Sequence, residues 1–253
     1  MGWLVITAEG DEAGRWAAER LAYAGLEPLV VVTDVDLVGA IWDHRVGNDG
    51  TASRLTLGDG RVVDSGEIWG TLNRLQVAPP PPLVAEDREY GFHEISALLM
   101  SWLASLPGPM LNPPDSRGLA GAWRSPAEWA VLAAEAGLRA APVTVDPDSE
   151  WPGDGSGWRA WPPYAPVAED VIVVGEAVFA SEPMAEETIG ACRRLASLAR
   201  TPLLGLLFSC ATCGGSPEIA GVTPLPDLRA AEDEVIEALA LALRGEQNGR
   251  GAR

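Results

Sequence analysis

Residues 3–33 read WLVITAEGDEAGRWAAERLAYAGLEPLVVVT, two apolar runs on either side of an amphipathic segment. The short apolar runs Trp3–Thr7 and Leu29–Val32 predict two buried strands. The intervening stretch Asp11–Ala24 predicts a helix, because its apolar side chains recur at helical spacing and Gly25 follows where a helix commonly ends. A strand–helix–strand unit of this length predicts parallel strands joined by a right-handed crossover.

Downstream of this unit the same patterns continue and predict an α/β fold. Asp-Gly at 59–60 predicts a hairpin between Ser53–Leu57 and Arg61–Val63, and four prolines end a stiff segment over 77–82. Further helices are expected at 34–41, 86–106, 126–136, 185–199 and 231–243, and further strands at 110–112, 143–145, 171–174, 177–180, 203–209 and 222–225. We expect residues 245–253 to form a disordered tail.

The charge balance limits which partners the chain can bind. Its 253 residues carry 36 acidic and 18 basic side chains, a formal net charge of −18. Both a nucleic-acid backbone and an anionic membrane would repel such a surface, so we expect neither as a partner. All 18 basic residues are arginine. The absence of lysine excludes a Schiff-base lysine, a lysine general base and a lysine phosphate clamp.

Targeting signals and disulfides are not expected. The apolar start of the chain meets Glu9 and Asp11 almost at once and has no basic segment before it. The longest apolar runs are too short to span a bilayer. Three cysteines, an odd number, argue against a secreted disulfide framework. We therefore expect a cytoplasmic protein that does not insert into a membrane.

Polar residues at the end of the apolar stretch Trp69–Leu75 are candidate binding residues. Asn73 and Arg74 stand where the carboxyl edge of a parallel sheet would meet a cleft. There, Arg74 could clamp a carboxylate or phosphate with two hydrogen bonds. The alternative is that Arg74 forms an ion pair with Glu89 or Glu94 on the following helix.

Cys210 and Cys213 form a C-x-x-C motif, which is typical of thiol–disulfide exchange or of half a zinc site. Cys192 is the only other cysteine, and the two histidines, His44 and His93, lack metal-ligand spacing. Structural cysteines therefore remain the first interpretation, and both a thiol redox role and a metal site remain alternatives. No glycine-rich phosphate loop follows the first strand, where the residues are acidic instead.

Residues 146–170 are rich in proline, glycine and tryptophan and lack any periodicity. Tryptophan is enriched at binding hot spots, so Trp151, Trp158 and Trp161 are candidate partner-binding residues. We expect this segment either to fold back over a cleft or to dock onto a partner.

Taken in order, several of these segments resemble the ATP-grasp ligases, particularly those that modify ribosomal peptides. The resemblance rests on Trp69–Leu75, on the helix that carries Glu94, on LPGPMLNP at Leu106–Pro113 with Asn112, and on AAEAGL at Ala133–Leu138. From Val171 onward the chain is similar to the last strands and terminal helix of that family, so that about two thirds of it is covered. The resemblance implies an N-terminal Rossmann-like pre-ATP-grasp lobe at 1–112. It implies a truncated ATP-grasp-like lobe at 113–244, with residues 146–170 as an insert.

The resemblance also implies groups that this chain lacks. Members of the family use two lysines to contact nucleotide phosphates, and here there is none. The positions of the family's magnesium ligands fall on Phe208–Cys210 and on Val222–Asp227, which lack the acid and the Glu-x-Asn pair. An enzyme that stabilises phosphoryl transfer electrostatically depends on such groups.

The sequence therefore favours a non-catalytic ATP-grasp-like accessory protein that needs no cofactor and binds a partner enzyme or substrate peptide. Its candidate binding residues are Asn73, Arg74, Glu94, Asn112, Trp151, Trp158 and Trp161. The alternatives are an ATP-dependent carboxylate–amine ligase and a thiol redox or metal protein using Cys210 and Cys213. An oligomer is compatible with all of these functions.

Overall fold

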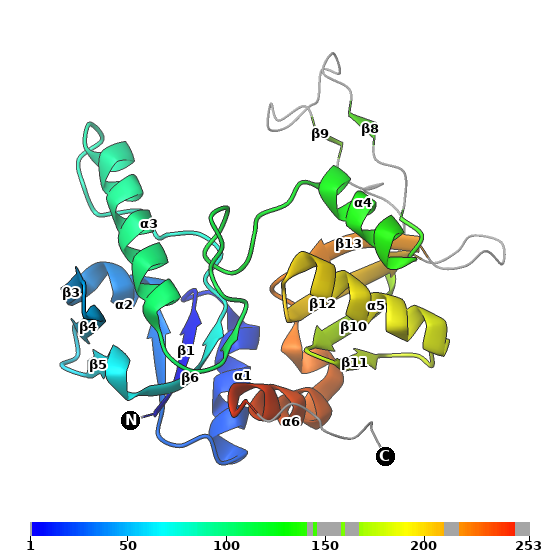
Figure 1. Ribbon diagram of the computed structural model, residues 1–253, viewed down its shortest axis with the longest axis horizontal. Coiled ribbons are helices and arrows are strands. Elements are labelled where there is room, and N and C mark those ends of the chain that lie inside the picture. The colour runs from blue at the N-terminus through cyan, green and yellow to red at the C-terminus, as the bar shows by residue number, and fades with distance from the viewer. Residues whose placement is uncertain (1, 141–143, 146–157, 160–166, 210–217, 246–253) are drawn as a thin grey trace. The chain divides into compact units, whose positions relative to one another are not determined.

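The computed structural model describes residues 2–140, 144–145, 158–159, 167–209 and 218–245 (Figure 1). The chain divides into two compact units, one formed by Met1–Ala122 together with Asp227–Arg253 and the other by Trp123–Pro226. The first unit is discontinuous because the C-terminal helix returns to it, whereas the sequence assigned residues 113–244 to a second lobe. None of the helices in the described residues is long and apolar enough to cross a membrane.

A four-stranded parallel sheet in the order β2-β1-β6-β7 forms the centre of the first unit. Its strands are β1 (Gly2–Thr7), β2 (Leu29–Thr33), β6 (Ile68–Asn73) and β7 (Met110–Leu111). The helix α1 (Glu12–Tyr23) connects β1 to β2, and Gly25 follows it with a φ of 84°. The predicted strand–helix–strand unit with parallel pairing is therefore confirmed.

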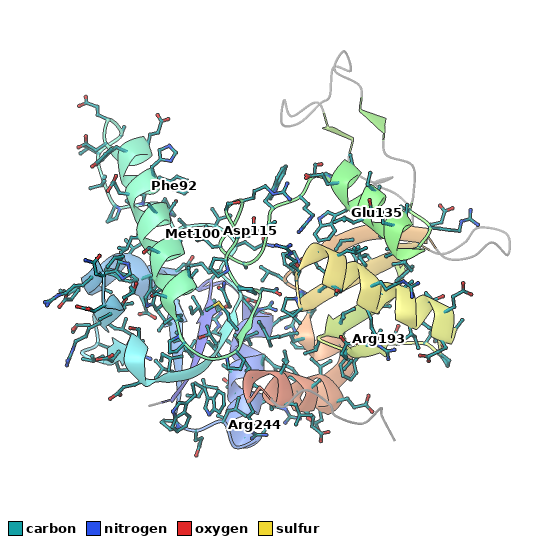
Figure 2. The ribbon with its side chains drawn as sticks, viewed as in Figure 1. Phe92, Met100, Asp115, Glu135, Arg193 and Arg244 are labelled. Atoms are coloured by element: carbon teal, nitrogen blue, oxygen red, sulfur yellow. The ribbon has the colours of Figure 1, made fainter. Side chains whose placement is uncertain are left out.

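Helices pack on this sheet. The C-terminal helix α6 (Glu232–Leu243) contacts α1, β6 and β7. Arg244, just after α6, donates to the Ala24 carbonyl at the end of α1 at 3.0 Å (Figure 2). Leu4 and Ile6 of β1 share a buried cluster with Leu99 of α3 (Arg88–Ser105). Sequentially distant segments thus enclose one core.

A smaller antiparallel sheet, β3-β4-β5, follows the short helix α2 (Asp34–Gly39). It consists of β3 (Ile41–Gly47), β4 (Gly50–Thr56) and β5 (Val62–Asp64). The pairing of β4 with β5 confirms the hairpin predicted around Asp59 and Gly60. The sequence did not predict β3, because Ile41 and Val46 are exposed and the strand lacks a buried apolar face.

The second unit contains an antiparallel sheet in the order β11-β10-β12-β13. Its strands are β10 (Val167–Val174), β11 (Ala177–Ala180), β12 (Leu203–Ser209) and β13 (Glu218–Thr223). The helices α4 (Pro126–Ala136) and α5 (Glu186–Ala199) share its buried cluster, in which Trp129 and Cys192 pack with Phe208. The mixed α/β architecture agrees with the predicted fold class.

Two strand boundaries differ from the sequence predictions. The last strand of the second unit begins at Glu218 rather than Val222, because the polar Glu218 occupies a ladder position opposite Ser209. Within 146–170, which we expected to be irregular, β9 (Trp158–Arg159) pairs with β8 (Thr144–Val145), and β10 already begins at Val167. Backbone pairing sets these boundaries, and it leaves no periodic signal in such short or polar stretches.

Gly108, between α3 and β7, is required by both its dihedral angle and its surroundings. Its φ is 78°, and a Cβ built there would lie 2.1 Å from the Trp69 carbonyl oxygen. We expect Gly108→Ala to lower the free energy of unfolding by about 2–5 kcal/mol, through left-handed strain and overpacking together. Urea denaturation measures this loss.

Gly60 is the matched control, because its φ is 88° but no atom lies within 4 Å of a built Cβ. Gly60→Ala should cost only the dihedral strain, about 1–2 kcal/mol. Equal losses at the two positions would contradict the proposed steric requirement.

Candidate functional site

The candidate site lies where the end of β6 meets the turn before α1. The backbone N–H of Arg74 donates to the Ile6 carbonyl at 2.8 Å, which holds Arg74 beside the end of β1. Its guanidinium donates to both carboxylate oxygens of Asp11, from Nε at 2.6 Å and from Nη2 at 3.0 Å. The Arg74 side chain is 2% exposed and that of Asp11 is 13% exposed. The pair is therefore a buried, two-pronged ion pair.

Asp11 is held from two further directions. The Thr7 hydroxyl donates to Oδ2 at 2.8 Å, and the Gly14 backbone N–H donates to Oδ1 at 2.9 Å, so that Asp11 also caps α1. A Cβ on Gly14 would lie 2.6 Å from both Asp11 Oδ2 and Thr7 Oγ1. Only glycine leaves room for this arrangement.

Burial by itself would raise the pKa of the Asp11 carboxyl. The hydrogen bonds and positive charge of Arg74 outweigh that effect, with smaller contributions from Gly14 and Thr7, so the pKa lies below its ordinary value. Asp11 is therefore ionised at neutral pH and neutralises Arg74. An internal carboxylate already occupies the position at the start of α1 where an external anion would bind.

The sequence anticipated only part of this arrangement. It placed Arg74 at the carboxyl edge of the sheet, where the structure has it, but named Glu89 or Glu94 as the ion-pair alternative. The structure gives Asp11 as the partner instead, and Glu94 is exposed on α3. A signal was present in the sequence, because Asp is a favoured residue immediately before a helix.

Asn73, the last residue of β6, is fully buried and serves to hold two loops. Its Nδ2 donates to the carbonyls of Asn112 at 2.9 Å and Leu119 at 2.7 Å, and its Oδ1 accepts from the Leu75 N–H at 3.2 Å. Asn112 is also fully buried and has a φ of 58°. These contacts bring Asn73 and Asn112 together, and they give both residues a structural role in joining the end of β6 to the segment after β7.

The remaining candidate residues lie elsewhere. His93 and Glu94 are exposed on α3. Trp158 begins β9, and its side chain lies outside the described residues, as do Trp151, Trp161, Cys210 and Cys213. Of the predicted residues whose side chains the structure describes, it brings together Asn73, Arg74 and Asn112, and Glu94 lies apart from them on α3.

The acidic groups near the ends of β12 and β13 are also engaged. The Glu218 carboxylate pairs with Arg139 at 2.8 Å, and Ser209 Oγ donates to the Glu218 carbonyl at 3.2 Å. Asp227 pairs with Arg229 at 2.8 Å, and the hydrogen bond from Arg229 lowers the pKa of Asp227. Among the described residues, no three His, Cys, Asp or Glu side chains are grouped so that they could hold a metal ion. Each of these two carboxylates is thus held by an arginine of the same chain.

Solved structures of similar fold were found. The macrocyclase MdnC of Microcystis aeruginosa MRC, bound with precursor peptide MdnA, has a TM-score of 0.71 at 14% identity, and the alignment covers 97% of this chain and 100% of that one. A RiPP-associated ATP-grasp ligase of Chryseobacterium gregarium, in complex with ADP and a leader and core peptide, has a TM-score of 0.70 at 11% identity, with 100% and 99% covered. The chain has an ATP-grasp-like fold.

The ATP-grasp ligase PsnB, complexed with minimal precursor, Mg and ADP, is a further match, with a TM-score of 0.65 at 15% identity over 96% of this chain and 97% of that one. No model of a protein family and no curated protein matches the sequence. At these identities the ATP-grasp-like similarity concerns the fold, which confirms the resemblance read from the sequence.

Asn73→Ala should destabilise the protein, because it removes the buried amide that donates to the carbonyls of Asn112 and Leu119. We expect a loss of about 2–4 kcal/mol in the free energy of unfolding, measured by urea denaturation. Gln76→Ala, three residues later at an exposed position, is the control and should change the free energy by less than about 0.5 kcal/mol. Similar small effects of both variants would contradict a scaffold role for Asn73.

The Asp11–Arg74 pair should make stability dependent on acid. A carboxyl with a lowered pKa in the folded state stabilises the protein above its unfolded pKa of about 4, and this contribution disappears as the pH falls through the lower, folded pKa. Asp11→Asn should lower the free energy of unfolding by about 3–5 kcal/mol at neutral pH, because it removes the carboxylate that accepts both hydrogen bonds from the buried Arg74 guanidinium. The difference in the free energy of unfolding between wild type and Asp11→Asn should become smaller as the pH falls below about 4.

Urea denaturation of both proteins, from neutral pH to below about 4, measures this difference in the free energy of unfolding. Asp49→Asn, at an exposed position, is the control and should change the free energy of unfolding by less than about 0.5 kcal/mol at neutral pH. A difference for Asp11→Asn that stays constant down to acidic pH would contradict the ion-pair account.

Proposed function

We propose that this chain is a non-catalytic ATP-grasp-like protein that binds a substrate peptide, or the enzyme that modifies it, in a biosynthetic or maturation pathway. Support comes from the ATP-grasp-like fold, since MdnC and the Chryseobacterium ligase were solved with peptides bound. The odd number of cysteines favours a reducing compartment, so the proposed binding takes place in the cytoplasm.

One observation carries the non-catalytic part of this proposal, namely that Asp11 already neutralises Arg74. Arg74 is the arginine best placed to hold an anion at the carboxyl edge of the sheet, and its guanidinium is buried against a carboxylate of the same chain. The chain also has no lysine to contribute an ammonium for nucleotide phosphates. Transition-state stabilisation of phosphoryl transfer depends on such cations.

The proposed partner-binding residues are Glu94, which is exposed on α3, and, separately, the tryptophans Trp151, Trp158 and Trp161 of the segment 146–170. Asn73, Arg74 and Asn112 would contribute indirectly, by fixing the loops around the end of β6.

The competing function is ATP-dependent carboxylate–amine ligation, with arginines in place of lysines. The solved neighbours favour it, since the Chryseobacterium protein and PsnB are described as ligases and hold ADP. Nucleotide binding separates the two functions.

We expect purified full-length chain to show no heat of binding with Mg·ATP in calorimetry and no change in unfolding temperature. A ligand present at 100 times its Kd would raise the free energy of unfolding by about 2.7 kcal/mol, which a thermal scan readily detects. ADP release with and without candidate peptides completes the measurement. Saturable Mg·ATP binding that chelation reverses would overturn the non-catalytic proposal in favour of the ligase.

A further inference from the structure

A cavity of about 190 Å³ lies in the second unit, between the C-terminal end of α5 and the turn that joins β10 to β11. Arg193, Ser197 and Arg200 line it from α5 and its cap, and Gly175 and Glu176 line it from the turn. Steps of four and three residues place positions 193, 197 and 200 on one side of a helix. Two guanidinium groups and one hydroxyl therefore share a small cavity, in a chain whose formal net charge is −18.

Backbone contacts hold the walls of this cavity together. Arg193 Nε donates to the Glu176 carbonyl at 2.7 Å, which ties α5 to the turn (Figure 2). The Gly175 N–H donates to the Pro202 carbonyl at 2.8 Å, so the turn is also joined to the segment after α5. The cavity is therefore formed by the fold itself and needs no ligand to assemble it.

Several donors in the cavity are available to a ligand. In the part of the chain that the structure describes, the side chains of Ser197 and Arg200 form no hydrogen bond or ion pair with another residue. Arg193 Nη1 meets Glu186 at 3.5 Å, and the Glu186 side chain is 82% exposed. Exposed ion pairs of this kind contribute little, so Arg193 can exchange that contact for a ligand.

Arg200 occupies a backbone position that favours glycine. It caps α5 with a φ of 52°, in the left-handed region. The ends of α1, α4 and α6 instead carry glycines at positive φ, namely Gly25 at 84°, Gly137 at 87° and Gly245 at 71°. A side chain at such a position lowers stability, and strain of this kind is typical of functional residues.

The C-terminal end of a helix normally disfavours an anion, because its last carbonyls are unpaired. At the end of α5, the Ser197 carbonyl accepts from the Arg200 N–H at 3.0 Å, and the Ala196 carbonyl accepts from the Thr201 N–H at 3.0 Å. The Ala199 carbonyl accepts from Arg124 Nη2 at 2.8 Å. Because these carbonyls are paired, the positive charge of the two guanidinium groups dominates the cavity.

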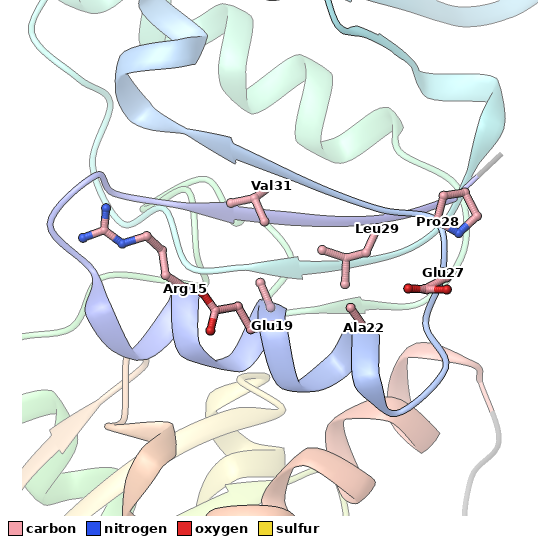
Figure 3. A pocket seen from close by; sticks show the side chains of 8 residues that line it. Arg15, Glu19, Ala22, Glu27, Pro28, Leu29 and Val31 are labelled. Atoms are coloured by element: carbon pink, nitrogen blue, oxygen red, sulfur yellow. The ribbon is translucent and has the colours of Figure 1, made fainter.

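The larger trough of the first unit has a different charge pattern (Figure 3). It measures about 830 Å³ and lies between α1 and β2, and its charged residues are Arg15, Glu19 and Glu27. One basic and two acidic side chains give it no excess of positive charge. The cavity beside α5 has two arginines and one acidic residue, Glu176. Of these two concavities, the one beside α5 is the one that suits an anion.

We propose that the cavity beside α5 binds a small dicarboxylate. Arg193 and Arg200 are seven positions apart, a rise of roughly 10 Å along a helix, which suits two separate anionic groups better than one. Each guanidinium would hold one carboxylate with two parallel hydrogen bonds, and the Ser197 hydroxyl would donate to one of the two.

The size of the cavity limits the ligand to a short diacid. Sites for drug-sized ligands measure about 300–1,000 Å³, and this cavity is smaller. A nucleotide would not fit inside it. The inference is therefore independent of the proposed function, because it requires neither a nucleotide nor a peptide partner.

Isothermal titration calorimetry on the full-length chain, with succinate as the probe, tests this site. Succinate should bind saturably. Butyrate has the same carbon chain but one carboxylate, and it should bind at least tenfold more weakly, because a hydrogen bond to a charged group contributes more than one factor of ten. Inorganic phosphate, a single compact anion, should also bind at least tenfold more weakly.

Variants assign the binding to the cavity. Arg200→Gln should raise the dissociation constant of succinate at least tenfold, whereas Glu176→Gln should lower it, because a like charge is removed. Arg194→Gln is the matched control. It changes the net charge by the same amount on the same helix but lies outside the cavity, so it should alter the dissociation constant by less than about twofold.

Arg200→Gly separates a ligand-binding role from a structural one. This variant should lose succinate binding as Arg200→Gln does. Without ligand, its unfolding temperature should rise by about 1–3 °C, because glycine relieves the left-handed strain. A side chain that serves the fold would instead lower the unfolding temperature when it is removed.

Three results would overturn the inference. The first is an absence of saturable succinate binding to wild type up to about 10 mM. The second is succinate binding that Arg200→Gln and Glu176→Gln both leave unchanged. The third is equal affinity for succinate and for butyrate or phosphate, which would show that the cavity does not recognise two carboxylates.

Discussion

The ion pair between Arg74 and Asp11 links the end of β6 to the turn that precedes α1. It closes the carboxyl edge of the parallel sheet, which is where sheets of this kind commonly bind ligands. Thr7 and Gly14 belong to the same arrangement, one as a donor and the other as the residue whose missing side chain leaves room for the carboxylate. The geometry of β1, α1 and β6 thus depends on one neutralised charge.

Asn73 extends this linkage from the sheet to the loops. Because its amide holds the carbonyls of Asn112 and Leu119, the segment after β7 is fixed by the residue adjacent to Arg74. Two consecutive residues therefore connect the end of β6 both to the start of α1 and to the segment after β7. Asn73 and Arg74 look like exposed binding residues in the sequence, but both are buried, and their polar groups are hydrogen-bonded within the protein.

Local patterns in the sequence were sufficient for the regular elements that carry an apolar face of their own. The alternation over residues 3–33 predicted the parallel unit. The helix predicted at 126–136 is α4, and Ser125 forms a capping box at its start. The strand β3 and the start of β13 were missed because they are stabilised by pairing with neighbouring strands rather than by an apolar face of their own. Sequence spacing likewise could not identify Asp11 as the partner of Arg74, since 63 residues separate them and only the packing of α1 against the sheet brings them together.

The energetics of a buried pair bear directly on what the sheet edge can bind. For an external anion to take the two donors of Arg74 that bind Asp11, Asp11 would have to be displaced and left without its counter-charge. Breaking a buried pair in this way typically costs about 3–5 kcal/mol. Since each 1.4 kcal/mol corresponds to a factor of ten, the apparent affinity of such a ligand would fall by roughly 10² to 10⁴. A phosphate or carboxylate held by one arginine seldom recovers that much, because a hydrogen bond to a charged group contributes only about 1.5–3 kcal/mol. Under the proposed function, partner selection therefore falls to the exposed surfaces, where no internal charge has to be displaced first.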